Sequence, residues 1–133
     1  MVDVVNKTRS NINLKLVEKV SSKFLELIKE KRDVSIVFVG DKRIQDLNKS
    51  YRHKDKVTDI LSFDGDRDFF GEIIIDYAQI KRQAKIFSKS VKDELVFILI
   101  HGLLHLQGYD DKTEKGRLQM EKLGESFVKK IKY

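Results

Sequence analysis

The stretch that decides the fold is residues 91–108, which read VKDELVFILIHGLLHLQG. Every position from Leu95 to Ile100 is apolar. Because a helix that is apolar on every side must be buried on every side, the sequence predicts a central helix over residues 91–107. Gly108 follows at the position where a left-handed residue ends a helix. The apolar run is shorter than the roughly 20 residues that span a bilayer, so we expect a core helix rather than a membrane anchor.

The segments before and after this helix carry the patterns of short apolar strands and amphipathic helices. We expect strands at about residues 2–6, 34–39, 59–63 and 69–75. We expect further helices at about residues 13–31, 41–49, 77–87 and 113–131. Asn13 and Asp41 stand where helix N-caps are expected. These elements predict one α+β domain over residues 1–133.

Composition and charge narrow the possible functions. The 133 residues include no Cys, which excludes disulfide scaffolds, thiolate zinc sites and cysteine nucleophiles. The net charge is +6, but residues 41–56 carry +3, residues 57–78 carry −5 and residues 112–133 carry +4. Basic segments suit a polyanion such as RNA, although a well-solvated surface gives the same count. Residues 1–20 lack the apolar run of a signal peptide, so we expect a cytoplasmic protein with no membrane contact.

Two of the three histidines, His101 and His105, lie four residues apart in the central helix. Residues at this spacing share one helix face, and two such imidazoles can bind one metal ion. A single buried His is commonly a packed residue with one hydrogen bond, but two in an apolar helix both need partners, and a metal ion serves both. In the metzincin-type arrangement the third ligand stands ten residues after the first His, which is Asp111 here. We favour Asp111 over Asp110, which also suits a turn or a hydrogen-bond acceptor behind the site.

Three blocks of the sequence resemble the YbeY family of bacterial endoribonucleases that act in rRNA maturation. Residues 101–111, HGLLHLQGYDD, match the family signature H-G-x-L-H-L-x-G-Y-D-H, except that Asp111 replaces the last His. Residues 47–63, LNKSYRHKDKVTDILSF, are similar to L-N-x-x-[YF]-R-x-x-D-x-P-T-D-V-L-S-F, with Val57 in place of the usual Pro. Residues 71–73, GEI, resemble the family's G-D-I strand, and Ala84 follows at the expected distance.

The resemblance implies a small α+β domain with a short mixed β-sheet, in which the buried central helix carries the His pair of a metal cleft. It implies cleavage of single-stranded RNA in rRNA maturation, at the 3′ end of small-subunit rRNA, and a part in ribosome quality control. The implied partners are RNA, the small ribosomal subunit and its assembly factors. The implied metal is one Zn²⁺ held by His101, His105 and Asp111. An Asp in place of the third His also admits other divalent metals, such as Ni or Mn.

The family's essential arginine falls on Arg52. RNA cleavage builds negative charge on the phosphoryl group, and a guanidinium can bind two of its oxygens in a fork, as Lys cannot. We therefore expect the catalytic residues to be Arg52, His101 and His105. The expected substrate-binding or cleft-lining residues are Arg52, Thr58, Asp59 and Ser62. Basic segments 41–56 and 112–133 are expected to flank the cleft and hold the RNA, and the acidic segment 57–78 is not.

Two other functions are open on the sequence alone. One is a ribosome-assembly protein that binds RNA and uses its metal for structure, which would need a closed site of four ligands where the sequence offers three. The other is a metalloprotease, which would carry its general base as a Glu directly after the first His, where this chain has Gly102. The general base of RNA cleavage is not identified, since a water or the substrate's own 2′-hydroxyl can attack.

Overall fold

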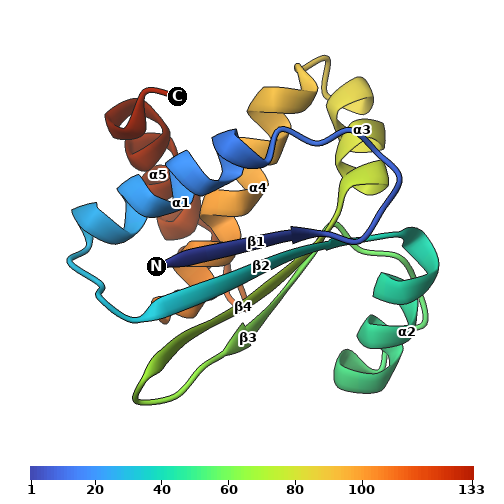
Figure 1. The fold of residues 1–133 in the computed structure, drawn as a ribbon, viewed down its shortest axis with the longest axis horizontal. Helices are drawn as coiled ribbons and strands as arrows, with labels where there is room; N and C mark the ends of the chain where they lie inside the picture. The colour runs from blue at the N-terminus through green and yellow to red at the C-terminus, as the bar shows by residue number, and fades with distance from the viewer.

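The computed structural model describes residues 1–133 as four strands and five helices. The strands are β1 (Val2–Asn6), β2 (Asp33–Val39), β3 (Ile60–Asp64) and β4 (Phe69–Asp76). The helices are α1 (Leu14–Leu27), α2 (Asp41–Arg52), α3 (Tyr77–Ile86), α4 (Val91–Leu106) and α5 (Glu114–Ile131). Figure 1 shows α1, α4 and α5 on one side of the sheet and α2 on the other.

The sheet is mixed, as expected, with the strand order β1-β2-β4-β3. β1, β2 and β4 run parallel, and β3 pairs antiparallel with β4. Alternate residues of each strand face opposite sides of the sheet. Ile36 and Ile73 belong to the main core beneath α1, α4 and α5, whereas Val39 and Ile74 join a smaller cluster under α2. Both faces of the sheet are therefore covered, and the strands are correspondingly rich in Val and Ile.

α4 is the central helix that the sequence predicts. It contacts α1, α3, α5, β3 and β4, and its core residues Leu99, Ile100, Leu103 and Leu104 are fully buried. Gly108 follows it with φ +109°, which confirms a left-handed residue at the end of the helix. No helix of the protein combines the length and the apolar content that a membrane crossing requires.

Two predicted helix ends are wrong. α1 ends at Leu27 rather than near residue 31, because Lys29 takes a left-handed conformation with φ 57° and its N–H bonds back to the carbonyl of Glu26. α2 runs on to Arg52 rather than ending near residue 49, and His53, with φ 57°, closes it. The longer α2 places Arg52 on the last turn of a helix instead of in a loop.

The start of α2 also differs from the expectation. Asp41 is the first residue of the helix and not its N-cap, which is Gly40 without a side-chain hydrogen bond. The Asp41 carboxylate instead accepts two hydrogen bonds from Arg82 of α3, at 2.7 and 3.3 Å. Arg82, a partner from another helix, thus takes the place of the local N-cap hydrogen bond of Asp41. The sequence gives no sign of this long-range contact. Asn13 does cap α1, because its side chain accepts a hydrogen bond from the N–H of Leu16.

Candidate metal centre and its cleft

His101 and His105 meet on one face near the C-terminal end of α4. Their Nε2 atoms are 3.1 Å apart, and both rings are partly buried. Two nitrogen ligands of a tetrahedral Zn²⁺, each at about 2.0–2.1 Å, stand roughly 3.3 Å apart, so the pair already has the spacing of two ligands of one ion. The i, i+4 geometry of a rigid, buried helix therefore holds this half of the site in place.

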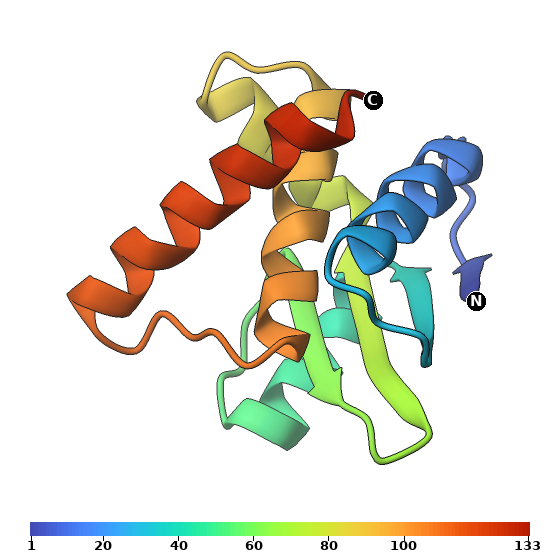
Figure 2. The ribbon, with the colours of Figure 1, turned by 90° about the vertical axis from the view of Figure 1, so that its left-hand side faces the viewer.

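Asp111 completes the group of potential metal ligands with His101 and His105, and Asp110 does not. The Oδ2 atom of Asp111 lies 3.7 Å from Nε2 of His101, and the ligand atoms of all three residues lie within 4.8 Å of one another. The Asp110 carboxylate instead accepts a hydrogen bond from the N–H of Lys112 in the turn before α5. Gly108 makes this arrangement possible, since its positive φ turns the chain back after α4. The loop from α4 to α5 is seen most clearly in Figure 2.

The electrostatics of the site favour a neutral imidazole at His101. Burial lowers the pKa of His101 below its usual range, and the neighbouring His105 lowers that pKa further, while Asp111 and Asp59 oppose the change. Metal ligation requires a deprotonated imidazole nitrogen. Two imidazoles and a carboxylate at these distances fit a divalent cation, and Asp111 is half exposed.

An open cavity of about 970 Å³ adjoins the group. His101 and His105 line it from α4, Arg52 lines it from the end of α2, and Lys112 and Arg117 line it from the α5 side. These residues come from segments that lie up to 65 positions apart in the chain. The structure therefore brings Arg52 to the same cavity as the His pair, which the sequence predicts only through the family resemblance.

β3 and the turn before it form a further wall of this cavity. Thr58, Asp59 and Ser62 all line it. The hydroxyl of Thr58 donates to the Asp59 carboxylate at 3.4 Å, and that of Ser62 donates to the carbonyl of Gly102 at 3.2 Å. Ser62 thus ties β3 to α4 directly beside the His pair.

Gly102 faces this strand. A Cβ added there would stand 2.5 Å from Cδ1 of Ile60 and 3.3 Å from Oγ of Ser62. A larger side chain at this position would push β3 away from α4. The absence of a protease-type Glu after His101 therefore has a packing reason as well as a chemical consequence.

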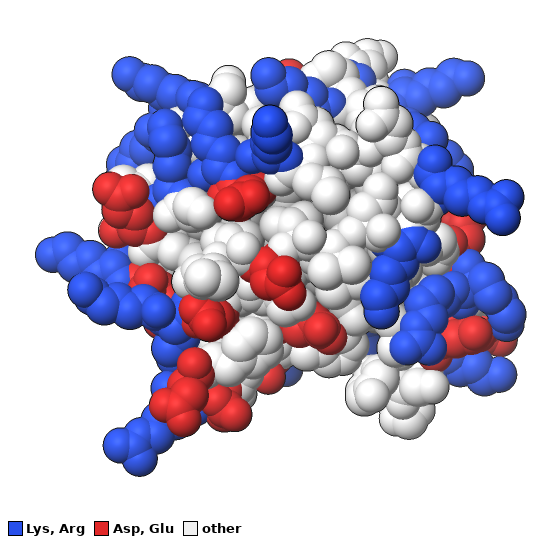
Figure 3. All heavy atoms as spheres, viewed as in Figure 1, with Lys and Arg blue, Asp and Glu red and all other residues white.

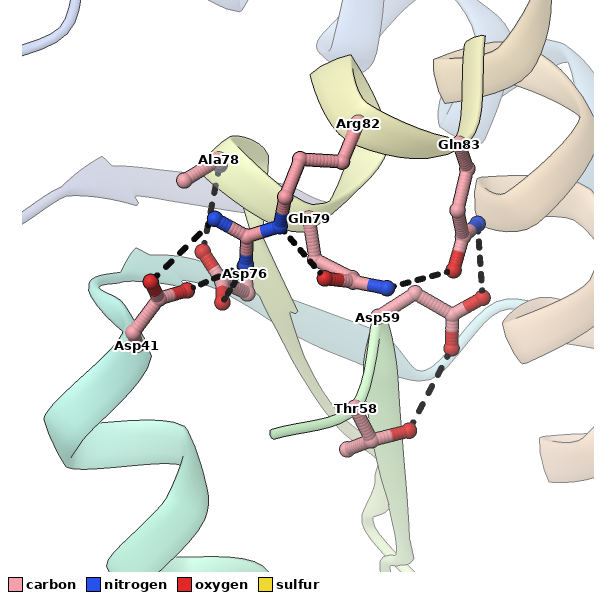
Figure 4. A network of polar contacts seen from close by, with 8 residues as sticks. All are labelled: Asp41, Thr58, Asp59, Asp76, Ala78, Gln79, Arg82 and Gln83. Carbon is pink, nitrogen blue, oxygen red and sulfur yellow. Dashed lines mark hydrogen bonds and ion pairs between the residues drawn. The ribbon is translucent and has the colours of Figure 1, made fainter. Parts of the chain in front are cut away.

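The Asp59 carboxylate is held from behind by a chain of hydrogen bonds that sequence reasoning misses (Figure 4). Arg82 Nε donates to Gln79 Oε1 at 2.8 Å, and Gln79 Nε2 donates to Gln83 Oε1 at 3.2 Å. Gln83 Nε2 then donates to both Asp59, at 3.2 Å, and Glu94, at 2.9 Å. Because a guanidinium only donates and a carboxylate only accepts, the ends of the chain fix the orientation of both amides. In the sequence, the i, i+4 spacing of Gln79 and Gln83 is the only local pattern that indicates this chain of hydrogen bonds.

The network includes two buried carboxylates with different partners. Glu94 also accepts from Lys89 Nζ at 2.9 Å. Asp76 is fully buried, and its burial together with the neighbouring Asp41 raises the pKa of Asp76 to about 7. The hydrogen bonds from Arg82 lower the pKa of Asp41. The two aspartates therefore differ in protonation, with the proton on the buried one at mildly acidic pH.

The charge expectation for the cleft is half right. Residues of both basic segments line the cavity, namely Arg52 from 41–56 and Lys112 and Arg117 from 112–133. The exclusion of segment 57–78 is wrong, because residues 58–64 line the cavity too. Two of the acidic residues of that segment, Asp66 and Asp68, lie farther along, in the tip of the β3–β4 hairpin at the lower left of Figures 1 and 3. The net charge summed over residues 57–78 therefore mixes residues that line the cavity with residues of the distant hairpin tip.

Comparison with known proteins gives a consistent result. The family described as "Endoribonuclease YbeY" matches residues 3–132. Proteins of that name include one from Acholeplasma laidlawii, 40% identical over 106 residues (77% of each chain), and one from Aliarcobacter butzleri, 35% identical over 134 residues (96% of this chain and 92% of the relative). The solution structure of a Thermotoga maritima protein superposes with a TM-score of 0.71 at 28% identity, covering 98% of this chain and 89% of the other. A match over nearly the whole chain, on a fold that assembles the same motif residues around one cavity, places this protein in the YbeY family.

Proposed function

We propose that this protein is a metal-dependent endoribonuclease that cleaves single-stranded RNA. Its relatives in the phytoplasma of aster yellows witches'-broom, in Acholeplasma laidlawii and in Aliarcobacter butzleri are named endoribonucleases, which supports the activity. The main structural support for the proposed site is that its residues lie around one cavity. Arg52 and the group of His101, His105 and Asp111 border the same open cavity.

The metal would be held by His101, His105 and Asp111, with Zn²⁺ as the first candidate. Such an ion supplies Lewis acidity, which polarises a phosphoryl oxygen and lowers the pKa of a bound water. The carboxylate of Asp111 reduces the net charge of the site compared with three imidazoles and admits harder cations. Only three protein ligands are present, which supports an open catalytic site rather than a closed structural one.

Arg52 is the residue that would bind the scissile phosphate. It is exposed on the last turn of α2, lines the cavity and takes part in none of the ion pairs of the chain. Its guanidinium can therefore offer two parallel N–H donors to phosphate oxygens, and these bonds strengthen as charge develops during cleavage. Lys112, which lines the same cavity, adds positive charge for the same RNA strand.

Thr58, Asp59 and Ser62 would shape the substrate side of the cavity. Asp59 is an acceptor fixed by Gln83, so it would orient a hydroxyl or a water rather than bind phosphate. Ser62 would act by holding β3 at its distance from α4. We place the substrate among rRNA precursors, at the 3′ end of small-subunit rRNA, with the ribosomal subunit and its assembly factors as partners in the cytoplasm.

Replacement of Arg52 tests the proposal. Arg52→Ala is expected to lower the rate of single-stranded RNA cleavage by about 100-fold or more, because it removes the donors that stabilise the developing charge. Arg52→Lys should recover little of the loss. Metal content should stay at the wild-type value. The matched control is Arg43→Ala on the same helix, which removes the same charge outside the cavity and should leave the rate unchanged. Full cleavage by Arg52→Ala would contradict the proposed role.

A further inference from the structure

Tyr51 is an exposed aromatic side chain at the mouth of the cavity. It lies in the last turn of α2, 65% exposed, beside Arg52. Seven large hydrophobic side chains of the protein are exposed, and Tyr51 is the one among them that lines the cavity. An exposed aromatic ring in a cavity is more informative than one on an open surface, because the cavity restricts what can contact it.

The ring of Tyr51 rests on a rigid support. Its centroid lies 5.1 Å from that of Phe63 in β3, with the ring planes at 69°. Phe63 also lines the cavity and packs against the small core cluster under α2. An edge-to-face contact of this kind restricts the ring of Tyr51 but does not cover all of its surface, so that ring can still contact a further partner. Tyr51 is therefore held in position by the sheet and still open to the cavity.

We propose that Tyr51 is a stacking platform for an unpaired nucleobase of the RNA, next to the phosphate bound by Arg52. This inference rests on the proposed function and deepens it. Aromatic side chains bind single strands by stacking on bases, whatever their sequence, and a neighbouring cation follows the backbone. Tyr51 and Arg52 both line the cavity, so a base and an adjoining phosphate of one RNA strand can be contacted together.

A stacking platform here gives a physical reason for a preference for single strands. In a duplex, both faces of each internal base are already covered by neighbouring bases, so an RNA helix has no free face to offer Tyr51. A single strand can turn a base out at modest cost and stack it on the ring. Tyr51 would thus select the conformation of the RNA, while Arg52 and the metal group act on the phosphate.

The test compares variants of Tyr51 for binding of a short, fluorescently labelled, single-stranded oligoribonucleotide and of the same oligomer with one abasic position. Tyr51→Ala is expected to weaken binding of the intact oligomer about tenfold. Tyr51→Leu keeps an apolar contact with Phe63 but has no aromatic face, and it should bind as weakly as Tyr51→Ala. Tyr51→Phe should bind like wild type. Phe87→Ala is the matched control, because Phe87 is an aromatic residue 60% exposed outside the cavity.

The abasic oligomers separate stacking from a general loss of affinity. When the abasic site falls at the stacked position, the wild-type protein should bind about tenfold more weakly, and Tyr51→Ala should show no further loss. The chain has no Trp, so Tyr51→Trp introduces a single tryptophan, which can be excited apart from the tyrosines and whose emission should be quenched by RNA. Tyr51→Ala that binds intact RNA as tightly as wild type, or Tyr51→Trp emission that RNA does not change, would overturn the platform. Failure of the wild-type protein to bind or cleave any RNA would instead refute the proposed function.

Discussion

Asp76→Asn is the substitution whose effect on stability follows most directly from the structure. Asp76 ends β4 and caps α3, because its Oδ1 accepts a hydrogen bond from the N–H of Ala78 at 3.1 Å. Its Oδ2 is buried without a hydrogen-bond partner and lies 3.9 Å from Nη2 of Arg82. Burial and the nearby Asp41 carboxylate raise the pKa of Asp76 to about 7. A proton on Oδ2 would give that atom a donor to direct at Asp41.

The size and sign of the effect follow from this pKa. The pKa rises from 3.8 in the unfolded chain to about 7 in the folded protein. At 1.36 kcal/mol per pKa unit, the group changes the free energy of unfolding by up to about 4 kcal/mol. Because the folded pKa is the higher one, this stability is present below about pH 4 and is lost as the pH rises through about 7. The lowered pKa of Asp41 acts below pH 4, outside this window.

Urea unfolding of wild type and Asp76→Asn, between about pH 4 and pH 8, measures the effect. Asn keeps the oxygen that caps α3 and places an NH₂ donor where the proton would be, but it does not titrate. We expect the variant to gain stability relative to wild type as the pH rises, by up to about 4 kcal/mol at the alkaline end. The control is Asp46→Asn on α2, a half-exposed carboxylate whose profile should run parallel to that of wild type. A difference between Asp76→Asn and wild type that is independent of pH, or that falls as the pH rises, would refute the reasoning.

Two further predictions concern the metal group and the network behind it. The wild-type protein should bind one divalent ion per chain, measured by calorimetric titration and elemental analysis. His101→Ala and Asp111→Asn should lose the ion, while Asp110→Asn should keep it. A full metal equivalent in His101→Ala would contradict the ligand set. Gln83→Leu leaves Asp59 without its amide donor, so the free energy of unfolding should fall by about 2 kcal/mol in a denaturation experiment, whereas an unchanged value would mean that the network adds no stability.

The features that the sequence predicts well are those set by neighbours along the chain. The apolar run around Leu99 fixes the central helix, and the spacing of His101 and His105 fixes their common face, because both depend on helix geometry alone. Helix ends were less predictable. Lys29 and His53 take left-handed conformations without being glycines, so no residue type in the sequence indicates where α1 and α2 end.

The features that the sequence misses depend on contacts between distant segments. Asp41, Asp76 and Arg82 come from the start of α2, the end of β4 and the middle of α3, and each alone looks like an ordinary cap or surface residue. Gln83 gives no hint that its amide stands between Asp59 and Glu94. Only the folded arrangement shows that these polar groups share one network.

The mixed charge of the cleft has a physical consequence for how RNA would lie in it. Arg52 supplies positive charge from α2, and Lys112 and Arg117 supply it from the α5 side, while Asp59 and Asp64 line the cavity from β3 and the turn before it. Arg117 is already paired with Glu121 at 2.7 Å, so less of its charge is free for a phosphate than that of Arg52 or Lys112. Phosphates therefore gain most near Arg52 and the metal group and are repelled along β3. The RNA strand would turn its bases, rather than its backbone, toward β3, where Phe63 offers aromatic surface in contact with Tyr51 of α2.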